Sequence, residues 1–473
     1  MTDAPVLLWF RADLRLADNP ALDAALASGR PVVAAFVLDT ALGDRWAIGG
    51  ASRWWLHHSL AALAQALAAR GNRLVLRAGP WQQELPRLAR ETGATSVHAG
   101  RLYAPWERAA DESVAKALRA EGIAITGHTS ALLHEPWAIR TQAGGPFAVY
   151  TPFSRRVFAA GEPAPLSPAP ARIPAPRTLP ESLPLEALGL LPRRPDWAGG
   201  LREAWQPGEA GAAARLEVFV AGPLVAYERT RDQPGVPGTS RLSPHLHFGE
   251  LSPRQAWHAA SGRRGAEKFL KELIWREFSH HLLWHRPEMP DTPLKDSFSR
   301  FPWRDDAVAL RAWQQGRTGY PIVDAGMREL WHTGWMHNRV RMVAASFLVK
   351  HLLLPWQAGE AWFWDTLVDA DAASNSASWQ WVAGSGADAS PWFRIFNPVL
   401  QGEKFDPDGA YVRRWVPELA RLPDRVIHQP WQAPATVLKD AGVVLEKTYP
   451  APLVAHDAAR ARALAALQSV QAE

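Results

Sequence analysis

The first third of the chain alternates short apolar runs with longer stretches that are rich in alanine and leucine. The short runs predict buried β-strands at residues 6–10, 32–38, 74–76, 96–98 and 123–125. The stretches between them, such as 56–70 and 108–120, have the periodicity of helices. Short apolar strands that alternate with helices predict an α/β fold built on a doubly wound parallel sheet.

The pattern changes twice further along the chain. Ten prolines fall between residues 160 and 195, which excludes continuous helix and predicts an extended linker that lies over the surface. Beyond it, helical periodicity dominates at 267–284, 325–331, 338–354 and 360–368. We therefore predict three segments: an α/β domain over 1–130, a proline-rich interdomain linker over 131–199 and an all-helical domain over 200–473.

Composition narrows the class of protein. Cysteine is absent, which excludes disulfides, thiolate metal sites and cysteine nucleophiles and fits a reducing cytoplasm, where we expect the protein to be located. The first residues do not form a signal peptide, and no apolar run is long enough to cross a bilayer, so we expect no membrane association. The formal net charge of +5 is compatible with a nucleic-acid partner. The 24 tryptophans could form a large core, stacking surfaces or an electron path.

Several common enzyme signatures are missing. The chain has neither the GxGxxG dinucleotide fingerprint nor the GxxxxGK phosphate loop, and it has no GxSxG nucleophile elbow. His281 and His285 have the spacing of a zinc pair, but no HExxH motif or third ligand accompanies them. We interpret both as ordinary helix histidines.

Candidate chemistry is concentrated in three segments of the helical region. The first, residues 238–244, combines hydroxyl groups, an arginine and the main-chain amides of a turn bounded by Gly238 and Pro244. Such a donor set suits a pyrophosphate. Serine and threonine are also typical of helix caps, and the segment alone favours that simpler interpretation.

The second segment is the helix around Glu272. Trp275 and Arg276 follow Glu272 at three and four residues, so all three share one helix face. An intrahelical ion pair beside a core tryptophan would explain the pattern. A carboxyl group beside a large aromatic face would equally suit a nucleobase, which has polar edges and a stackable ring.

The third segment places an amide, a guanidinium and a thioether on one helix face, at Asn338, Arg341 and Met342. Asp369 and Asp371 follow further along the chain. Two acids at this spacing could bind a metal, but the nearby arginines favour ion pairing.

Together with other motifs, these segments form a pattern that resembles the photolyase/cryptochrome family, closest to its bacterial cyclobutane pyrimidine dimer (CPD) photolyases. The resemblance spans nearly the whole chain and is specific because the motifs occur in order. They are LWFRxDLRLxDN at 8–19, TSRLS at 239–243, ELIWREF at 272–278, GYPIVDA at 319–325, GWMHNR at 334–339, WQW at 379–381 and FRIFNP at 393–398.

The resemblance implies a light-driven enzyme, a deoxyribodipyrimidine photo-lyase, with an antenna domain, a linker and a helical domain that binds FAD. Reduced FAD would absorb light and pass an electron to a pyrimidine dimer flipped out of DNA, whose cyclobutane ring then opens. Asn375 matches the position that faces flavin N5. The FAD-binding positions carried over are Tyr227, Thr239, Ser240, Arg241, Leu242, Ser243, Arg341, Asp369, Ala370, Asp371 and Asn375.

The resemblance also implies a substrate pocket for a CPD. Photolyases for the (6-4) product carry histidines at the positions of Asn338 and Met342, so that chemistry is not expected here. Glu272 would hydrogen-bond the pyrimidine and stabilise charge on it. The pocket positions are Glu272, Trp275, Asn338, Met342 and Trp381, and Arg231, Arg339 and Arg394 would hold DNA phosphates.

Three tryptophans, Trp379, Trp356 and Trp303, match the electron-transfer triad of the family, which runs from the flavin to the surface. The resemblance does not determine the antenna chromophore. Glu107 aligns with a folate contact, so we favour methenyltetrahydrofolate over a deazaflavin or no antenna, although Trp106 replaces the usual polar neighbour.

Two further departures from the family pattern concern the flavin region. Phe269 stands where many relatives have tryptophan, which keeps stacking but loses an indole hydrogen bond. The stretch 376–378 is less glycine-rich than in relatives, which puts the local backbone shape in doubt.

Other functions stay open beside dimer repair. The chain could be a cryptochrome-like blue-light photoreceptor without repair activity, or a light-independent flavoprotein or DNA-binding module that has lost the reaction. Asn375 and the intact pocket positions favour repair, and the last residues, from Ala458, predict a short alanine-rich helix in place of an extended signalling tail. We expect damaged DNA as the partner and a monomeric protein.

Overall fold

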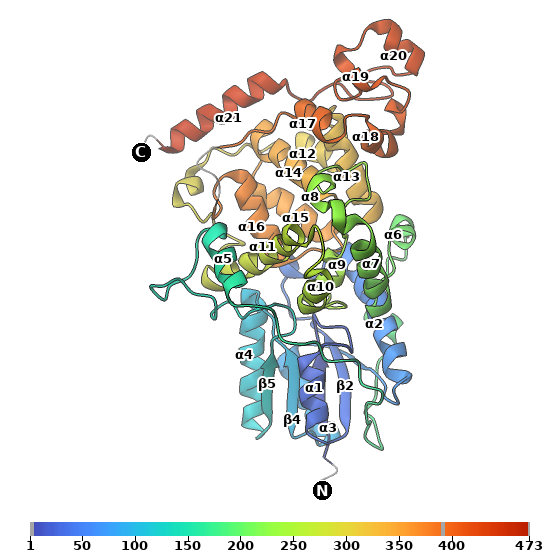
Figure 1. Cartoon of the computed structure of the whole chain (residues 1–473), viewed down its shortest axis with the longest axis vertical. Helices are drawn as coiled ribbons and strands as arrows, with labels where there is room; N and C mark the ends of the chain where they lie inside the picture. The colour runs from blue at the N-terminus through green and yellow to red at the C-terminus, as the bar shows by residue number, and fades with distance from the viewer. Residues whose placement is uncertain (1–3, 389–392, 472–473) are drawn as a thin grey trace. The chain divides into compact units, whose positions relative to one another are not determined.

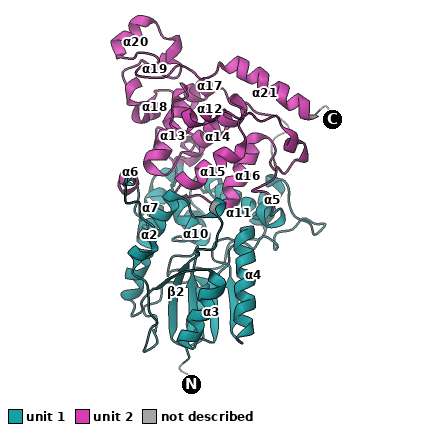
Figure 2. Ribbon diagram, turned by 180° about the vertical axis from the view of Figure 1, so that it is seen from behind, with its two compact units in different colours: residues 1–198, 205–225, 240–287 teal, residues 199–204, 226–239, 288–473 magenta. Residues whose placement is uncertain are grey.

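The computed structural model of the chain describes residues 4–388 and 393–471 (Figure 1). It divides into two compact units (Figure 2). The first unit comprises residues 1–198, 205–225 and 240–287, and the second comprises 199–204, 226–239 and 288–473. The division into an α/β domain over 1–130, a linker over 131–199 and a helical domain over 200–473 stays a prediction.

The first unit is built on a five-stranded parallel sheet with the strand order β3-β2-β1-β4-β5. Its strands are β1 Val6–Phe10, β2 Val32–Leu38, β3 Val75–Ala78, β4 Ser96–Gly100 and β5 Ala124–His128. The central strand β1 is buried along its whole length and pairs with β2 in the register Leu8 to Ala34. Helices connect the strands, so the predicted α/β fold with a doubly wound parallel sheet is confirmed.

The strand boundaries show how burial shapes the sequence pattern. The first two predicted strands agree with the structure at both ends, because central strands are continuous apolar runs. The edge strand β5 lies mostly exposed and begins one residue later than predicted, at Ala124. It also runs on to His128, because an exposed edge strand carries polar residues that an apolar pattern does not include.

Helices complete the first unit. Asn19 caps α1, accepting hydrogen bonds from the main-chain N–H groups of Ala21 and Leu22. The helices are α1 Pro20–Ala27, α2 Gly50–Ala68, α3 Trp81–Thr92, α4 Pro105–Ala120, α5 Tyr150–Ala159, α7 Glu209–Ala221, α9 Ser243–His247, α10 Pro253–Ala260 and α11 Ala266–His285, with 3-10 turns η1 Asp44–Trp46, η2 Leu185–Leu188 and η3 Pro223–Ala226, the last of which ends in the second unit.

The proline-rich segment is extended, as predicted, but it is not confined to the surface. The N–H of Val32 donates to the carbonyl of Pro174 (2.7 Å), and the N–H of Leu183 donates to that of Leu76 (2.9 Å). Ile173 is fully buried. The expectation of a linker that only covers the surface is therefore wrong for Ile173, because prolines block a regular ladder but leave other main-chain groups able to pair.

The second unit is helical and has one large hydrophobic core. Its helices are α6 Gly199–Ala204, α8 Tyr227–Thr230, α12 Ala307–Gln314, α13 Pro321–Thr333, α14 Asn338–Ser346, α15 Trp356–Thr366, α16 Ala372–Ala383, α17 Pro398–Phe405, α18 Ala410–Trp415, α19 Asp424–Ile427, α20 Ala435–Ala441 and α21 His456–Gln471. Short turns are η4 Asp296–Arg300, the π-helical η5 Phe347–His351, η6 Pro417–Leu419 and η7 Pro430–Gln432.

Two predicted helices end earlier than expected. The periodic stretch 338–354 forms α14 only to Ser346, and the π-helical turn η5 follows it. The helix expected over 360–368 ends at Thr366. Apolar periodicity continues through both ends because these residues are buried, so it does not mark where the helices stop. The alanine-rich helix predicted near the last residues is present as α21.

Among the described residues, we find no single helix that meets the length and apolarity needed to cross a membrane. One pair of consecutive helices, Glu209–Ala221 and Pro223–Thr230, is long and apolar enough when taken together. The two helices meet at an angle of 50°, and only their length and composition support a membrane span.

Candidate functional site

The hydroxyl-rich segment 239–243 forms a tight turn. Arg241 has a φ of 52°, and its guanidinium lies 4.4 Å from the ring centroid of Trp205. The hydroxyl of Ser240 accepts a hydrogen bond from the N–H of Leu242 (3.4 Å). The N-cap of α9 is Leu242, which in the described structure has no side-chain cap. The helix-cap interpretation is therefore wrong for α9, and the hydroxyl groups keep the alternative role of ligand donors.

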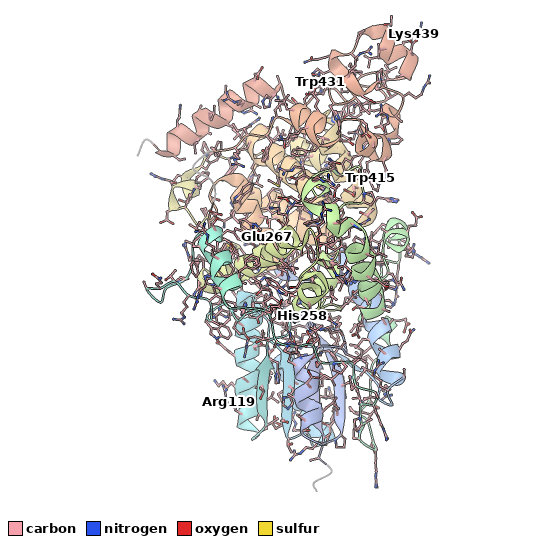
Figure 3. All side chains as sticks on the ribbon, in the orientation of Figure 1. Arg119, His258, Glu267, Trp415, Trp431 and Lys439 are labelled. Carbon is pink, nitrogen blue, oxygen red and sulfur yellow. The ribbon has the colours of Figure 1, made fainter. Side chains whose placement is uncertain are left out.

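On α11, the expected Glu272–Arg276 pair gives way to other partners. Glu272 pairs with Lys268 (3.6 Å), one turn earlier on the helix. Arg276 donates to the main-chain carbonyl of Ala131 (2.6 Å). The guanidinium of Arg276 therefore satisfies a carbonyl that lies outside any helix. The Glu272 carboxylate lies on the half-exposed face of α11. Glu267, labelled in Figure 3, lies on the first turn of the same helix and pairs with Lys271 (2.5 Å).

Trp275 is half-exposed, so it is not a core residue. Its ring stacks on Tyr150 of α5, with centroids 3.6 Å apart and planes at 3°. The hydroxyl of Tyr150 donates to the carbonyl of Lys271 on α11 (2.7 Å). The hydrogen bond anchors the tyrosine and the stacking fixes the plane of the indole, which gives α11 an ordered aromatic surface one turn from Glu272.

In the second unit, α14 presents the third segment. Its N-cap is His337, whose Nδ1 accepts a hydrogen bond from the N–H of Arg339 (3.2 Å). Arg341 forms an ion pair with Asp369, with Nη2 to Oδ2 at 2.8 Å, and donates from Nε to the carbonyl of Met336 (2.7 Å). Asp371 caps α16 by accepting from the N–H of Ser374 (2.7 Å).

This geometry decides between the two interpretations of the acids. Asp369 is an ion-pair partner and Asp371 is a helix cap, as the nearby arginines favoured. In the described part of the chain, no group of three or more histidine, aspartate or glutamate side chains could hold a metal ion. Ala370, between the two acids, is buried.

Asn375 is 8% exposed and lies on α16. Its side-chain Nδ2 donates to the main-chain carbonyl of Glu360 (3.1 Å), and the Glu360 carboxylate accepts from the hydroxyl of Ser376. The side-chain amide of Asn375 is therefore held by α15 through its nitrogen, and its Oδ1 is the acceptor of the group. The doubt about the backbone at 376–378 is removed, since these residues belong to the regular helix α16.

One acidic and two basic side chains form a cluster at the start of α14. The carboxylate of Asp232 lies 2.9 Å from an Nη of Arg339 and 3.8 Å from Nε of Arg231. Tyr227 is buried beneath the guanidinium of Arg231, which lies 5.5 Å from its ring centroid. Burial lowers the pKa of the neighbouring His337 to about 4, so its imidazole is neutral at pH 7.

The three triad tryptophans lie in or against one hydrophobic core cluster. Trp356 and Trp379 are each 2% exposed, and Trp303 is partly buried and packs against the cluster. Gly359, one turn after Trp356 on α15, makes room for Trp379: a Cβ there would lie 2.1 Å from its ring. Trp303 is thus more exposed than Trp379 and Trp356, and the role of the three as an electron path stays a prediction.

The remaining predicted pocket residues of the second unit differ in exposure. Asn338 and Arg394 are exposed, whereas Met342 and Trp381 are half-buried. The indole Nε1 of Trp381 donates to the carbonyl of Asp388 (3.2 Å). Asn338, Arg341 and Met342 share one face of α14, as their spacing predicted.

The predicted positions are therefore distributed over both units. Those in the first unit are Glu107, Ser240, Arg241, Leu242, Ser243, Glu272 and Trp275. Those in the second are Tyr227, Arg231, Thr239, Trp303, Asn338, Arg339, Arg341, Met342, Trp356, Asp369, Ala370, Asp371, Asn375, Trp379, Trp381 and Arg394. Their roles remain predictions.

The antenna candidate Glu107 lies in the first turn of α4. Its carboxylate accepts from the N–H of Ala104 (3.0 Å) and so caps its own helix. The neighbouring Trp106 stacks on Trp46, with centroids 4.1 Å apart and planes at 13°. The tryptophan that departs from the family pattern thus belongs to an aromatic pair within this unit.

Two minor predictions can also be examined in the structure. His281 donates from Nδ1 to the carbonyl of Pro136 (2.9 Å) and accepts at Nε2 from the N–H of Phe147 (2.9 Å). Both nitrogens are used, so His281 is an ordinary helix histidine, as predicted. Phe269 is buried and packs against Phe219 at 4.8 Å, so an aromatic contact is retained there.

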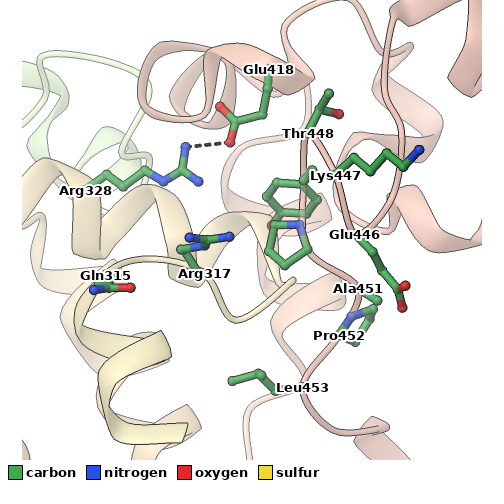
Figure 4. A pocket seen from close by; sticks show the side chains of 12 residues that line it. Gln315, Arg317, Arg328, Glu418, Glu446, Lys447, Thr448, Ala451, Pro452 and Leu453 are labelled. Carbon is green, nitrogen blue, oxygen red and sulfur yellow. Dashed lines mark ion pairs between the residues drawn. The ribbon is translucent and has the colours of Figure 1, made fainter. Parts of the chain in front are cut away.

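A cavity of about 670 Å³ in the second unit lies apart from every predicted position (Figure 4). Its lining is polar and includes the ion pair of Arg328 with Glu418 (2.8 Å). Because its lining includes both cations and carboxylates, the charges largely cancel and specify no ligand.

Sequence reasoning missed three residues that shape these groups: Tyr150, Asp232 and His337. Asp232 follows Arg231 directly, and His337 precedes Asn338, so proximity to predicted residues could have drawn attention to both. Nothing in the sequence points to Tyr150, because it is remote from Trp275 along the chain and only folding stacks the two rings.

Comparison with known proteins agrees with this architecture. Residues 6–175 match the family model described as DNA photolyase, and residues 269–469 match the FAD binding domain of DNA photolyase. The chain is 53% identical to the deoxyribodipyrimidine photo-lyase of Agrobacterium fabrum, over 99% of this chain and 98% of that protein. It is 40% identical to Cryptochrome-1 of Arabidopsis thaliana, over 98% of this chain and 70% of that one.

The solved structures agree as well. The crystal structure of a class III photolyase from Agrobacterium tumefaciens superposes with a TM-score of 0.97 at 52% identity, covering 100% of this chain and 99% of that chain. Fold, order of domains and sequence identity thus coincide over the whole length. The chain belongs to the photolyase/cryptochrome family, as an FAD-binding enzyme of the deoxyribodipyrimidine photo-lyase class.

Proposed function

We propose that the protein repairs cyclobutane pyrimidine dimers in DNA in a light-dependent reaction. The observation that carries the proposal is the surface of α11, where the Glu272 carboxylate lies one turn from the ordered indole of Trp275. A dimer offers stackable faces and polar edges, and this pair supplies a stacking ring and a hydrogen-bonding group for them.

The specificity for cyclobutane dimers is proposed from α14. Asn338 and Met342 share its face and carry an amide and a thioether, where (6-4) enzymes would have two histidines. Neither side chain is an acid at neutral pH, so neither could protonate a (6-4) product. An amide can hydrogen-bond a pyrimidine edge, and a thioether can contact its apolar face.

The residues proposed for FAD fit its chemical groups. The hydroxyl groups of Thr239 and Ser240 and the guanidinium of Arg241 form a donor set for a diphosphate. The Arg341–Asp369 pair would lie near the flavin ring. Asn375 is held through its Nδ2 by Glu360, which leaves its oxygen to accept from a protonated ring nitrogen such as N5.

FAD supplies the photochemistry when bound, as a light-driven source of one electron for the dimer. The chain supplies position and charge stabilisation. Trp275 and Trp381 would hold the flipped-out dimer by stacking, and Glu272 would stabilise the charge that develops on the pyrimidine. Arg231, Arg339 and Arg394 would hold the phosphates, and Trp379, Trp356 and Trp303 would carry electrons toward the flavin from the surface.

For the antenna, we retain methenyltetrahydrofolate as the proposal, with a deazaflavin or no antenna as alternatives. The support is Glu107 alone, and its carboxylate already caps α4. The absorption spectrum of the purified protein distinguishes the three cases. Monomeric state and cytoplasmic location also stay predictions.

Repair of a thymine-dimer oligonucleotide under blue light, with a dark control, tests the proposal. We expect light-dependent restoration of thymine that falls at least about tenfold in Glu272→Ala and in Trp275→Ala, from the loss of a charged hydrogen bond or a stacked ring. Glu267→Ala is the matched control, since it removes the same residue type from the same helix and from a similar lysine pair. Equal repair in the dark would disprove the mechanism.

The alternative is a cryptochrome-like photoreceptor, with which the 40% identity to a plant cryptochrome is compatible. The same experiment separates the two. Flavin photoreduction without any repair would assign the protein to the photoreceptors, and the triad variants would then become the informative ones.

A further inference from the structure

Two arginines of the second unit share one carboxylate. Asp232 lies immediately after Arg231, and its Oδ2 lies 2.9 Å from an Nη of Arg339, which comes from α14 far along the chain. Its Oδ1 lies 3.8 Å from Nε of Arg231. The side chains of Arg231 and Arg339 are 12% and 20% exposed, and that of Asp232 is 32% exposed. The carboxylate therefore connects two guanidinium groups at a partly buried position.

Each of the two guanidinium groups also lies over an aromatic ring. Arg339 lies 4.4 Å from the ring centroid of Phe405, and Arg231 lies 5.5 Å from that of Tyr227. A guanidinium held on its face by a ring and at one edge by a carboxylate loses little further freedom when its other donors bind. The geometry is thus set before any ligand arrives.

Two buried donors of this cluster have no hydrogen-bond partner within the described residues. They are Nε of Arg339 and Nε2 of His337. His337 accepts at Nδ1 from the N–H of Arg339, so its proton resides on Nε2 and the ring is a donor there. Buried donors without partners are costly, and a bound anion would satisfy them.

We propose that Asp232 is a positioning residue that holds Arg231 and Arg339 in the orientation needed for the phosphates of dimer-containing DNA. The inference rests on the proposed function. Non-specific binding depends on total charge and tolerates loose geometry, whereas the specific complex needs each phosphate contact in register. Asp232 therefore determines how strongly the protein prefers damaged over undamaged DNA.

Charge and geometry act on this preference in the same direction. Removing the carboxylate takes away a negative charge near the DNA, which strengthens non-specific binding. It also frees two guanidinium groups, which weakens the specific complex. Both changes lower the ratio of the two affinities.

The test is dark binding of a thymine-dimer duplex and of an identical undamaged duplex by wild type, Asp232→Asn and Asp424→Asn. Asp424 is the matched control, because it pairs with Arg413 at 2.8 Å in the same unit and its replacement changes the net charge equally. We expect the affinity ratio to fall about tenfold in Asp232→Asn and to stay within about twofold of wild type in Asp424→Asn. Flavin absorption and the unfolding temperature establish that each variant is folded, and Asp232→Ser is the second variant if the first fails to fold.

A double-mutant cycle shows whether Asp232 acts through Arg339. In an Arg339→Ala background, Asp232→Asn should lower the ratio by a smaller factor than in the wild-type background, because one of the two arginines that it positions is gone. An unchanged ratio in Asp232→Asn, or the same fall with and without Arg339, overturns the inference.

The same data separate this inference from the proposed function. If wild type binds damaged and undamaged duplexes equally, the proposed substrate is wrong and the positioning role falls with it. If wild type prefers the damaged duplex but both aspartate variants behave as wild type, only the role of Asp232 is wrong.

Discussion

Lys350 lies in the π-helical turn η5, and its side chain is 1% exposed. Its Nζ lies 3.0 Å from the ring centroid of Phe393 and has no hydrogen-bond partner among the described residues. Burial lowers the pKa of Lys350 well below its usual value. A lysine in this position costs stability, because the amine is desolvated and no hydrogen bond among the described residues offsets the loss of water.

Replacing Lys350 by methionine should therefore stabilise the protein, by about 1–3 kcal/mol at pH 7. The unfolded chain binds a proton that the folded amine releases, so wild-type stability should rise with pH between the lowered pKa and about 10.5. Lys350→Met should lose this rise. Calorimetric unfolding at pH 7 and pH 9 measures both effects.

Lys447→Met is the control for this prediction, since Lys447 is exposed and the substitution is the same. It should leave the unfolding temperature nearly unchanged. A Lys350→Met protein that is less stable than wild type at both pH values would contradict the prediction and would indicate that the amine has a favourable partner.

Packing between helices depends on single small residues. Gly359 of α15 faces Trp379 of α16, and a Cβ there would lie 2.1 Å from the indole. Trp379 also packs against Phe363, at 5.0 Å between centroids. The close approach of α15 and α16 therefore packs the indole of Trp379 against two residues of α15.

Gly359→Ala should force these helices apart and destabilise the protein by about 1–3 kcal/mol, despite the better helix propensity of alanine. Thermal unfolding measures the loss, and the fluorescence of the buried tryptophans should change with it. Gly199→Ala is the control, because a Cβ at Gly199 meets nothing within 4 Å. Equal unfolding temperatures for the two variants would contradict this account of the contact.

The last helix, α21, is attached through a histidine pair. Nε2 of His351 and Nδ1 of His456 lie 2.9 Å apart, and Arg462 donates to the carbonyl of His351 (2.5 Å). Burial lowers the pKa of His351 to about 3 and also lowers that of His456, although Asp457 opposes the second shift.

Acid should therefore loosen α21. Detached histidines take up protons near pH 6.5, whereas the packed pair does not, so stability is lost as pH falls from about 6.5 toward 3. The protection of residues 456–471 against hydrogen exchange, corrected for the intrinsic rate, should fall between pH 7.5 and pH 5, and His456→Asn should weaken this dependence. Exchange that is independent of pH after correction for the intrinsic rate would contradict the prediction.

The chain belongs to an FAD-binding class of enzyme, so ligand linkage should act on its stability. A ligand that binds only the folded chain stabilises it by about 2.7 kcal/mol when its free concentration is 100 times the Kd. Removing FAD should lower the unfolding temperature, and added FAD should restore it in a concentration-dependent way. Unfolding temperatures that do not respond to FAD would contradict FAD binding to the folded chain.

The sequence alone determined the fold class and most elements of this protein. Central strands such as β1 are continuous apolar runs, and long helices such as α11 have a strong local period, so both are encoded by neighbouring residues. The ordered motifs also determined the family, and the comparisons confirm it. The elements rest on patterns among neighbouring residues, and the family assignment rests on the order of motifs along the chain.

Only the tertiary structure decided which partner each polar group has. Glu272 pairs with Lys268 because Arg276 is taken by the carbonyl of Ala131, and Trp275 is ordered because Tyr150 stacks on it. Spacing along a helix gives several candidate partners of similar energy. Buried groups from distant segments choose among them, since each must satisfy its hydrogen bonds within the folded chain.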